Sequence, residues 1–140
     1  MDVHVIATGG TIASTADGDD RGAAPELSGD DLVESVPDLE SLASITVETL
    51  SDRPGFDMSL SICARVAARV HEIGSEADGV VVTHGTDTLA ETARYLDLTC
   101  DAPVVVTGAQ RRPDELGGDG PTNLRTAVRA AAHERVTSGT

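Results

Sequence analysis

Two turns of this sequence place threonine hydroxyl groups beside glycines, and each turn directly follows an apolar run. The first turn, residues 8–13, follows the apolar residues 3–7, and the second, residues 83–93, follows the apolar residues 79–82. In parallel α/β sheets, ligands bind at the carboxyl ends of the strands. We therefore expect both turns to border one binding site, and this pairing is the main indication of function.

The first turn contains a candidate nucleophile, Thr11. A threonine hydroxyl attacks a carbonyl only when a base removes its proton and fixed donors stabilise the oxyanion that forms. Gly9 and Gly10 permit a sharp backbone turn that exposes N–H groups beside Thr11. The alternative is a glycine turn in which Thr11 only bonds its own backbone. This turn by itself favours that alternative, because short motifs often match by chance.

The second turn contains a hydroxyl, Thr86, and a carboxylate, Asp87. Asp87 lies where a helix is expected to begin, so it either caps that helix or holds an ammonium group of a ligand. Thr88 and Glu91 have the spacing of a capping box, which leaves Asp87 free to face a cleft. His84 titrates near neutrality, but a hydrogen-bonded structural role at the strand end is the favoured interpretation.

Two later segments are further candidates. Residues 108–112 follow an expected strand, so their backbone can line the same cleft. Residues 119–124 read Asp-Gly-Pro-Thr-Asn-Leu, which a turn and a helix start with an early proline would explain. The sequence has no metal-ligand spacing and no Walker A, G-x-G-x-x-G or G-x-S-x-G motif. We therefore expect no metal site and no Ser-His-Asp triad.

The composition restricts the partners. The 140 residues include 24 acidic and 10 basic side chains, and all the basic ones are arginine, giving a net charge of -14. This charge repels nucleic acid phosphates and anionic lipid, so we expect neither as a partner. Acid excess together with lysine depletion favours a halophilic protein over an ordinary acidic one.

Cys63 and Cys100, both in expected helices, are interpreted as buried reduced thiols. Met1 leads directly into a strand without a signal peptide pattern, which predicts a cytoplasmic location.

The apolar pattern predicts strands alternating with helices, and hence an α/β fold with a parallel sheet. A polar loop is expected over residues 14–26 and a turn over residues 52–58. The fourth strand is expected to be buried, and the small sheet would have an uncovered edge. The strands are expected at residues 3–8, 45–50, 79–83 and 103–107, and the helices at residues 29–34, 59–73, 88–99 and 120–135.

The combination of motifs resembles the L-asparaginase family. Residues 8–13 resemble the first signature of the family and residues 84–93 the second, while residues 103–109 and 119–124 match the pattern around them. The resemblance extends from Val3 to about Ala132, in the family's order. It implies that residues 1–140 are the N-terminal domain of an asparaginase, truncated before the C-terminal domain. The implied fold is a Rossmann-like (flavodoxin-like) parallel sheet flanked by helices, incomplete relative to the family.

The resemblance implies hydrolysis of L-asparagine to L-aspartate and ammonia through an acyl-enzyme ester on Thr11. Thr86 would belong to a second hydroxyl group, and Asp87 would bind the substrate α-ammonium group. The Gly85 N–H would bind the α-carboxylate, and the Ala109 carbonyl the side-chain amide. The family needs no cofactor. Full-length members are homo-oligomers whose sites lie between subunits and include residues from a neighbour's C-terminal domain.

Three departures from the family pattern predict that the 140-residue chain is inactive or very weak. The family uses a lysine beside its second threonine, and this chain contains none. Members with a lid use a lid tyrosine, whereas the only tyrosine here, Tyr95, falls in an expected helix. Gly55 stands where the family has a serine that binds the carboxylate, and Ser51 or Ser59 would replace that serine after a shift in register.

Two alternative functions remain open. One is the asparaginase-like subunit of a tRNA-dependent amidotransferase, which releases ammonia for another subunit. Such subunits carry an additional N-terminal domain, whereas the first strand here is expected at residue 3, so this alternative is disfavoured. The other is a non-catalytic module that binds amino acids, which the missing lysine and the missing second domain favour. A nucleotide-binding domain is a weaker third choice because the phosphate fingerprint is absent.

Overall fold

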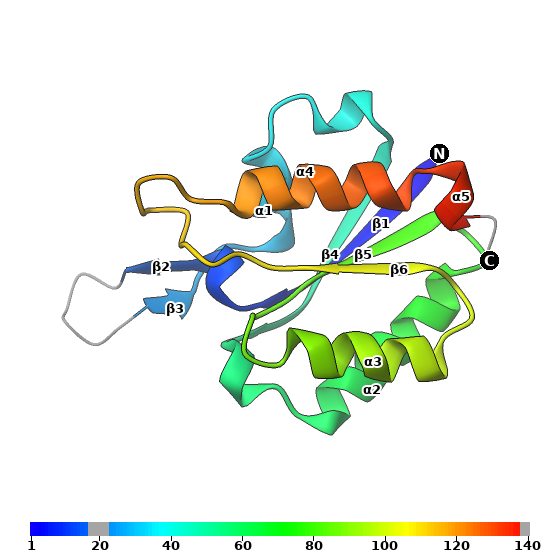
Figure 1. Cartoon of the computed structure of the whole chain (residues 1–140), viewed down its shortest axis with the longest axis horizontal. Helices are drawn as coiled ribbons and strands as arrows, with labels where there is room; N and C mark the ends of the chain where they lie inside the picture. Colours follow the sequence, from blue (N-terminus) through cyan, green and yellow to red (C-terminus); the bar gives the residue numbers. More distant parts are fainter. Residues whose placement is uncertain (17–22, 138–140) are drawn as a thin grey trace.

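The computed structural model describes residues 1–16 and 23–137, and its centre is a parallel sheet of four strands. The order across the sheet is β4-β1-β5-β6, and every neighbouring pair is parallel (Figure 1). The predicted α/β fold with a parallel sheet is therefore confirmed. The strands are β1 (Asp2–Gly9), β4 (Ser44–Arg53), β5 (Gly79–Thr83) and β6 (Val104–Thr107).

Helices cover both faces of the sheet (Figure 1). Side chains alternate between the faces along a strand, so strands buried on both faces need continuous apolar runs. Val5 and Val81 lie in one core cluster, which includes residues of α1 (Gly29–Glu34), the 3₁₀ turn η2 (Leu39–Ser41) and α4 (Gly120–Ala131). Ile6, Val80 and Val82 lie in the other cluster, with α2 (Leu60–Ile73) and α3 (Leu89–Thr99).

Local sequence signals explain where the helices begin and end. The Ser28 side chain accepts a hydrogen bond from the Asp31 N–H, and Asp31 completes a capping box at the start of α1. The Ser59 hydroxyl accepts a bond from the Ile62 N–H at the start of α2, and that helix ends at its C-cap, Gly74. These helices lie where the sequence predicts them, as does α3.

The segment predicted as a polar loop over residues 14–26 contains regular structure, so that prediction is wrong in part. Ser14–Ala16 (β2) and Ala23–Pro25 (β3) form an antiparallel pair, and residues 17–22 lie outside the described residues. The final helix is also shorter than predicted. α4 ends at Ala131 and is followed by the short helix α5 (Glu134–Thr137).

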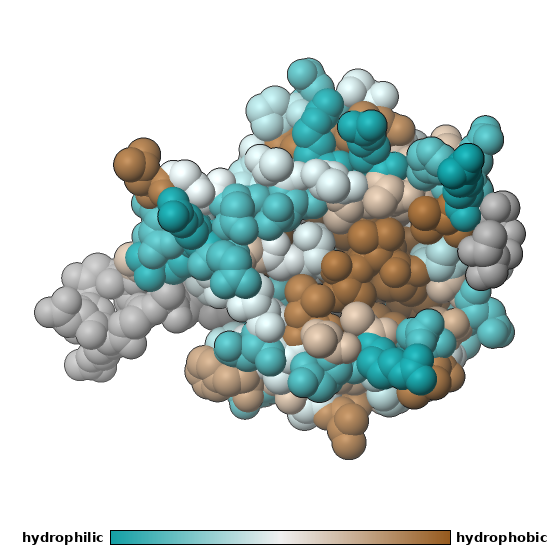
Figure 2. All heavy atoms as spheres, viewed as in Figure 1, coloured by the Kyte–Doolittle hydropathy of each residue, from teal (hydrophilic) through white to brown (hydrophobic). Residues whose placement is uncertain are grey.

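The fourth predicted strand, β6, is partly exposed, so its predicted burial is wrong. It is an edge strand, and the edge of a parallel sheet lacks a neighbour to cover its side chains. Beside it, a hollow of about 640 Å³ is lined by residues that include Leu89, Val104, Val106 and Val136. Figure 2 shows an apolar patch on this face, between α3 and α4. The uncovered sheet edge that the sequence predicts is therefore present.

The two cysteines are free thiols, in agreement with the prediction, but they differ in position. Cys63 is buried within α2. Cys100 is the C-cap of α3 and is only partly buried, so the prediction that it is a buried thiol within a helix is wrong. Burial raises the pKa of the Cys100 thiol. No helix in the described parts of the chain has both the length and the hydrophobicity needed to cross a membrane.

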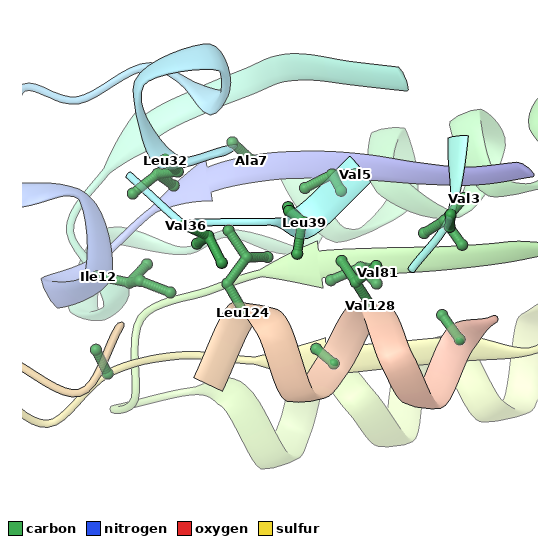
Figure 3. Packing of buried hydrophobic residues seen from close by; sticks show 14 of the residues in the cluster. Val3, Val5, Ala7, Ile12, Leu32, Val36, Leu39, Val81, Leu124 and Val128 are labelled. Carbon is green, nitrogen blue, oxygen red and sulfur yellow. The ribbon is translucent and has the colours of Figure 1, made fainter. Parts of the chain in front are cut away.

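Leu124 tests the packing of α4 against the sheet. Its side chain points from the helix toward Val36 and Leu39 (Figure 3) and is 1% exposed. We expect Leu124→Ala to lower the free energy of unfolding by about 2–5 kcal/mol, because it removes buried methyl groups and leaves a cavity. Leu98→Ala in α3 is the matched control, since Leu98 is 66% exposed, and it should change stability by less than about 0.5 kcal/mol. Equal losses in urea unfolding would contradict this packing.

Candidate active site

Three glycine backbones pack directly against one another at the carboxyl ends of β1, β4 and β5. A Cβ atom built on Gly10 would lie 2.3 Å from the Gly85 Cα, and one built on Gly85 would lie 2.4 Å from the Gly55 Cα. Gly10 follows β1, Gly85 follows β5, and Gly55 begins the 3₁₀ turn η3 (Gly55–Asp57) after β4. Any side chain would force these segments apart, so glycine is needed for the approach.

The turn that carries Thr11 is held by its backbone. Gly9 and Gly10 have φ angles of 89° and 83°, which favour glycine. The Gly10 N–H donates to the Arg53 carbonyl at 3.0 Å, and the Gly10 carbonyl accepts a bond from the Ser14 hydroxyl at 2.8 Å. Thr11 begins the 3₁₀ turn η1 (Thr11–Ala13) and is partly exposed. Its hydroxyl makes no hydrogen bond with the described residues, so the alternative in which Thr11 only bonds its own backbone is not observed.

The second turn leaves its two candidate side chains available. Thr86 is partly exposed and Asp87 is exposed, and neither side chain bonds to the described residues. The predicted capping box at Thr88 and Glu91 is wrong. The Thr88 hydroxyl makes no capping bond and instead donates to the Gly55 carbonyl at 2.8 Å. Thr88 thus joins the second turn to η3. The Asp87 side chain caps nothing and has no partner among the described residues, although the capping box that was to leave it free does not form.

His84 is a buried structural residue beside this turn. Its Nδ1 lies 2.7 Å from the Gly85 carbonyl, which can only accept a hydrogen bond, so Nδ1 carries the proton. Its Nε2 is buried and has no partner among the described residues. Burial holds the pKa of His84 below its ordinary value. Nearby, the buried Thr8 hydroxyl donates to the Thr83 carbonyl at 2.7 Å and joins the ends of β1 and β5.

The loop after β6 forms a third wall at the same edge of the sheet. A Cβ built on Gly108 would lie 2.5 Å from the His84 carbonyl oxygen, so this loop passes close to the second turn. The Asn123 side-chain amide donates to the Gly108 carbonyl at 2.9 Å. The Asp119 carboxylate accepts bonds from the N–H groups of Gln110 and Arg111. Ala109, predicted to bind substrate through its carbonyl, is buried between these anchors.

The sequence places Asp119 and Asn123 in a helix start and in the family pattern, but it assigns neither side chain a role. The missed signal was an acidic residue placed four positions before an amide residue, directly after a loop that follows a strand. Asp119 is the N-cap of α4, yet its side chain makes no capping bond with that helix. Its hydrogen bonds with loop N–H groups instead lower the pKa of its carboxyl group.

The proposed substitutes for the missing serine are engaged elsewhere. The Ser51 hydroxyl accepts a bond from the Arg53 N–H, and the Ser59 hydroxyl caps α2. A Cβ at Gly55 would lie 2.9 Å from the Gly85 Cα, so position 55 has no room for a side chain without a shift. Tyr95 packs against the α2–α3 core cluster. Among the described residues, no group of three or more His, Cys, Asp or Glu side chains is arranged to hold a metal ion.

The structure thus places Thr11, Thr86 and Asp87 at the carboxyl ends of the parallel strands. The backbones of Gly85 and Ala109 lie at the same end of the sheet. This is an α/β domain with hydroxyl- and carboxylate-bearing turns at its strand ends. Residues 2–139 match the family model described as "Asparaginase, N-terminal". The chain therefore belongs to the asparaginase family, as the sequence motifs indicate.

Relatives of known name agree with this assignment. The chain is 40% identical to the probable periplasmic L-asparaginase of Haemophilus influenzae over 137 residues, covering 95% of this chain and 39% of that protein. It is 36% identical to a glutamyl-tRNA(Gln) amidotransferase subunit of Methanosphaera stadtmanae, covering 92% of this chain and 30% of that protein.

A solved structure gives the same result. The probable cytoplasmic L-asparaginase of Campylobacter jejuni superimposes with a TM-score of 0.89 at 36% sequence identity, covering 96% of this chain and 43% of that one. The chain therefore spans less than half the length of each of these relatives.

Gly10→Ala tests whether the glycine contact is required. Gly117 is a matched control, because its φ is 75° but an added Cβ would meet only the end of the Arg111 side chain, at 3.1 Å. We expect Gly117→Ala to lower the free energy of unfolding by about 1 kcal/mol through backbone strain alone. Gly10→Ala should lose at least about twice as much, because the Gly85 backbone must also move. Equal losses in urea unfolding would show that the contact is dispensable.

His84 makes a prediction about pH. Because its pKa is lowered in the folded state, the unfolded chain binds more protons just below the ordinary value of 6.5. The contribution of His84 to the free energy of unfolding should therefore become less favourable as the pH falls below 6.5. In His84→Asn, which keeps a donor near the Nδ1 position, this contribution should disappear, while exposed His133→Asn should retain it. A stability difference between wild type and His84→Asn that stays constant from about pH 5 to 8 would contradict the assignment.

Proposed function

We propose that this chain is the nucleophile-bearing domain of an amidohydrolase that converts L-asparagine to L-aspartate and ammonia. The observation that carries this proposal is the contact between Gly10 and Gly85, which sets the Thr11 turn against the turn of Thr86 and Asp87. Membership of the asparaginase family supports it. Relatives named L-asparaginase support the choice of substrate.

In the proposed reaction, the Thr11 hydroxyl loses its proton to a base and its oxygen attacks the side-chain amide carbon of the substrate. The C–N bond then breaks, the leaving nitrogen takes up a proton, and ammonia departs, leaving an ester on Thr11. Water adds to that ester, the C–O bond breaks, and L-aspartate and the free hydroxyl are released. The Thr86 hydroxyl is the second hydroxyl group at the same edge. No cofactor or metal takes part.

The remaining site residues bind the substrate in this proposal. The Asp87 carboxylate pairs with the α-ammonium group, a charge-assisted hydrogen bond stronger than a neutral one. The Gly85 N–H binds the α-carboxylate, and the Ala109 carbonyl accepts a bond from the side-chain amide. Gly55 shapes the pocket through its backbone, because its Cα packs against Gly85.

The base is the missing component. The chain has no lysine, Asp87 is assigned to the ammonium group, and His84 is buried and bonded to Gly85. We infer that the rest of a longer protein, or a neighbouring subunit of a homo-oligomer, supplies the base. The 140-residue chain alone should therefore release ammonia weakly or not at all, since members of a cooperating catalytic set act non-additively.

Location and salt adaptation remain predictions. The relatives named above include both a periplasmic and a cytoplasmic protein, so these relatives do not select one location. The net charge of -14 supports a halophilic protein that repels nucleic acid and anionic membranes.

The similarity to amidotransferase subunits favours one second candidate, release of ammonia for a partner subunit. The two candidates differ in partner rather than in amide chemistry. Coexpression with an amidotransferase partner subunit, followed by an RNA-binding assay, separates them. A stable complex that binds tRNA would favour the amidotransferase.

Asp87→Asn tests the proposed binding mode. We expect it to weaken L-asparagine binding to the 140-residue protein by at least about tenfold, because a hydrogen bond between charged groups contributes about 1.5–3 kcal/mol. Calorimetry in high salt measures this affinity. Asp97→Asn, an exposed carboxylate of α3 paired with Arg94, is the control and should bind like wild type.

Two outcomes would contradict the proposal. Wild type that binds neither L-asparagine nor L-aspartate would remove the substrate assignment, and unchanged affinity in Asp87→Asn would remove the role of Asp87. The inference of a missing base has its own check. Robust ammonia release by the 140-residue protein, abolished in Thr11→Ala, would show that the chain already contains every group it needs.

A further inference from the structure

We propose that Asp119 and Asn123 are positioning residues that fix the Ala109 carbonyl and thereby set the preference of the site for a side-chain amide. This inference rests on the proposed function, because it takes Ala109 as the acceptor for the substrate amide. Its physical basis is independent of that function. It consists of hydrogen bonds that join Asp119, the N-cap of α4, and Asn123, in the first turns of α4, to the backbone on both sides of one loop residue.

The hydrogen bonds bracket Ala109. On its amino side, the Asn123 amide nitrogen donates to the Gly108 carbonyl at 2.9 Å. On its carboxyl side, the Asp119 carboxylate accepts bonds from the N–H groups of Gln110 at 3.1 Å and Arg111 at 2.8 Å. The Ala109 carbonyl and the Gln110 N–H belong to the same planar peptide group, so the bond from that N–H to Asp119 fixes the direction of the carbonyl. The preceding peptide group is held by Asn123.

The two anchors also hold each other. The Asn123 amide nitrogen donates to the Asp119 carboxylate at 2.9 Å, so its two N–H bonds go to Asp119 and Gly108. The Asp119 carboxylate accepts three N–H donors, and a carboxylate has only acceptor sites to offer. An amide at position 119 would turn its own NH₂ group toward one of these donors. A carboxylate is therefore the side chain that this arrangement requires.

These bonds are not the ordinary cap of α4. The Asp119 side chain makes no capping bond, and Pro121 stands in the first turn of the helix, where it has no N–H to be capped. The carboxylate is directed at the preceding loop instead. The Ala109 carbonyl, in contrast, accepts no hydrogen bond from the described residues. The Ala109 carbonyl is thus left without a protein partner, while the Gly108 carbonyl and the N–H groups of Gln110 and Arg111 are engaged.

A positioning role of this kind makes a prediction that a general structural role does not. If Asp119 directs the Ala109 carbonyl, its loss should weaken ligands that carry a side-chain amide and spare ligands that lack one. L-Asparagine and L-2-aminobutyrate share the α-ammonium and α-carboxylate groups, and only the first has the amide. The ratio of their affinities therefore reports on the Ala109 carbonyl and cancels effects on Asp87 and Gly85.

The test uses the ¹⁵N-labelled 140-residue protein in high salt, titrated with each amino acid and followed by NMR. In Asp119→Asn we expect the affinity for L-asparagine to fall about tenfold while that for L-2-aminobutyrate changes less than twofold. The amide proton resonances of Gln110 and Arg111 should shift upfield as their bonds to the carboxylate weaken. Asn123→Ala should lower the affinity ratio in the same direction, and it serves if Asp119→Asn does not fold. Asp97→Asn is the control.

The outcomes separate this inference from the proposed function. If wild type binds L-asparagine but Asp119→Asn and Asn123→Ala keep the wild-type affinity ratio, the positioning role is overturned and the proposed function stands. Equal weakening of both ligands also overturns it, because it indicates general damage to the site. If wild type binds neither amino acid, the proposed function fails and this inference fails with it. A tenfold fall confined to L-asparagine, with shifted Gln110 and Arg111 resonances, supports the inference.

Discussion

The site depends on the packing of three bare backbones, those of Gly10, Gly55 and Gly85. Their Cα atoms approach so closely that a single added methyl group at Gly10 or Gly85 would overlap its neighbour. The contact joins segments that follow three different strands, so the positions of these strands in the sheet fix the positions of the site residues. Thr11 and Thr86 each follow a contacting glycine by one position. Their placement is therefore set by the packing of backbones and does not depend on side-chain rotamers.

Buried hydrogen bonds reinforce this contact from several directions. The Thr8 hydroxyl joins β1 to β5, the Thr88 hydroxyl joins the second turn to η3, and His84 holds the Gly85 carbonyl. Thr11, Thr86 and Asp87 make none of these bonds. Such an arrangement is typical of binding sites, in which neighbouring groups fix the backbone and the side chains that contact the ligand have no protein partner.

Much of the fold could be predicted because its signals are local. Continuous valine runs identify β5 and β6, and apolar spacing from Ile62 to Ile73 identifies α2. The errors arise where distant contacts decide. Thr88 has capping-box spacing, but its hydroxyl bonds to Gly55, 33 positions away in the chain. The partial exposure of β6 depends on its place at the sheet edge, which the strand's own residues do not encode. β2 and β3 are three residues each and rich in small side chains, so they leave no periodic pattern.

The site shows the same limit. Thr11, Thr86 and Asp87 stand out in the sequence because two glycine-rich turns follow two strands. Asp119 and Asn123 do not, because their partners are backbone groups of a loop 8 to 15 positions earlier. A motif can identify a residue that touches a ligand, but it does not identify the residue that aims a backbone carbonyl. That information becomes visible only when the hydrogen-bond partners are known.

The most direct test of this account is a crystal structure of the protein bound to L-aspartate. The account predicts that the ligand lies between the hydroxyls of Thr11 and Thr86, with its α-ammonium group about 2.7–3.2 Å from the Asp87 carboxylate. Aspartate bound at another part of the molecule, or bound here without contact to either threonine, would contradict it.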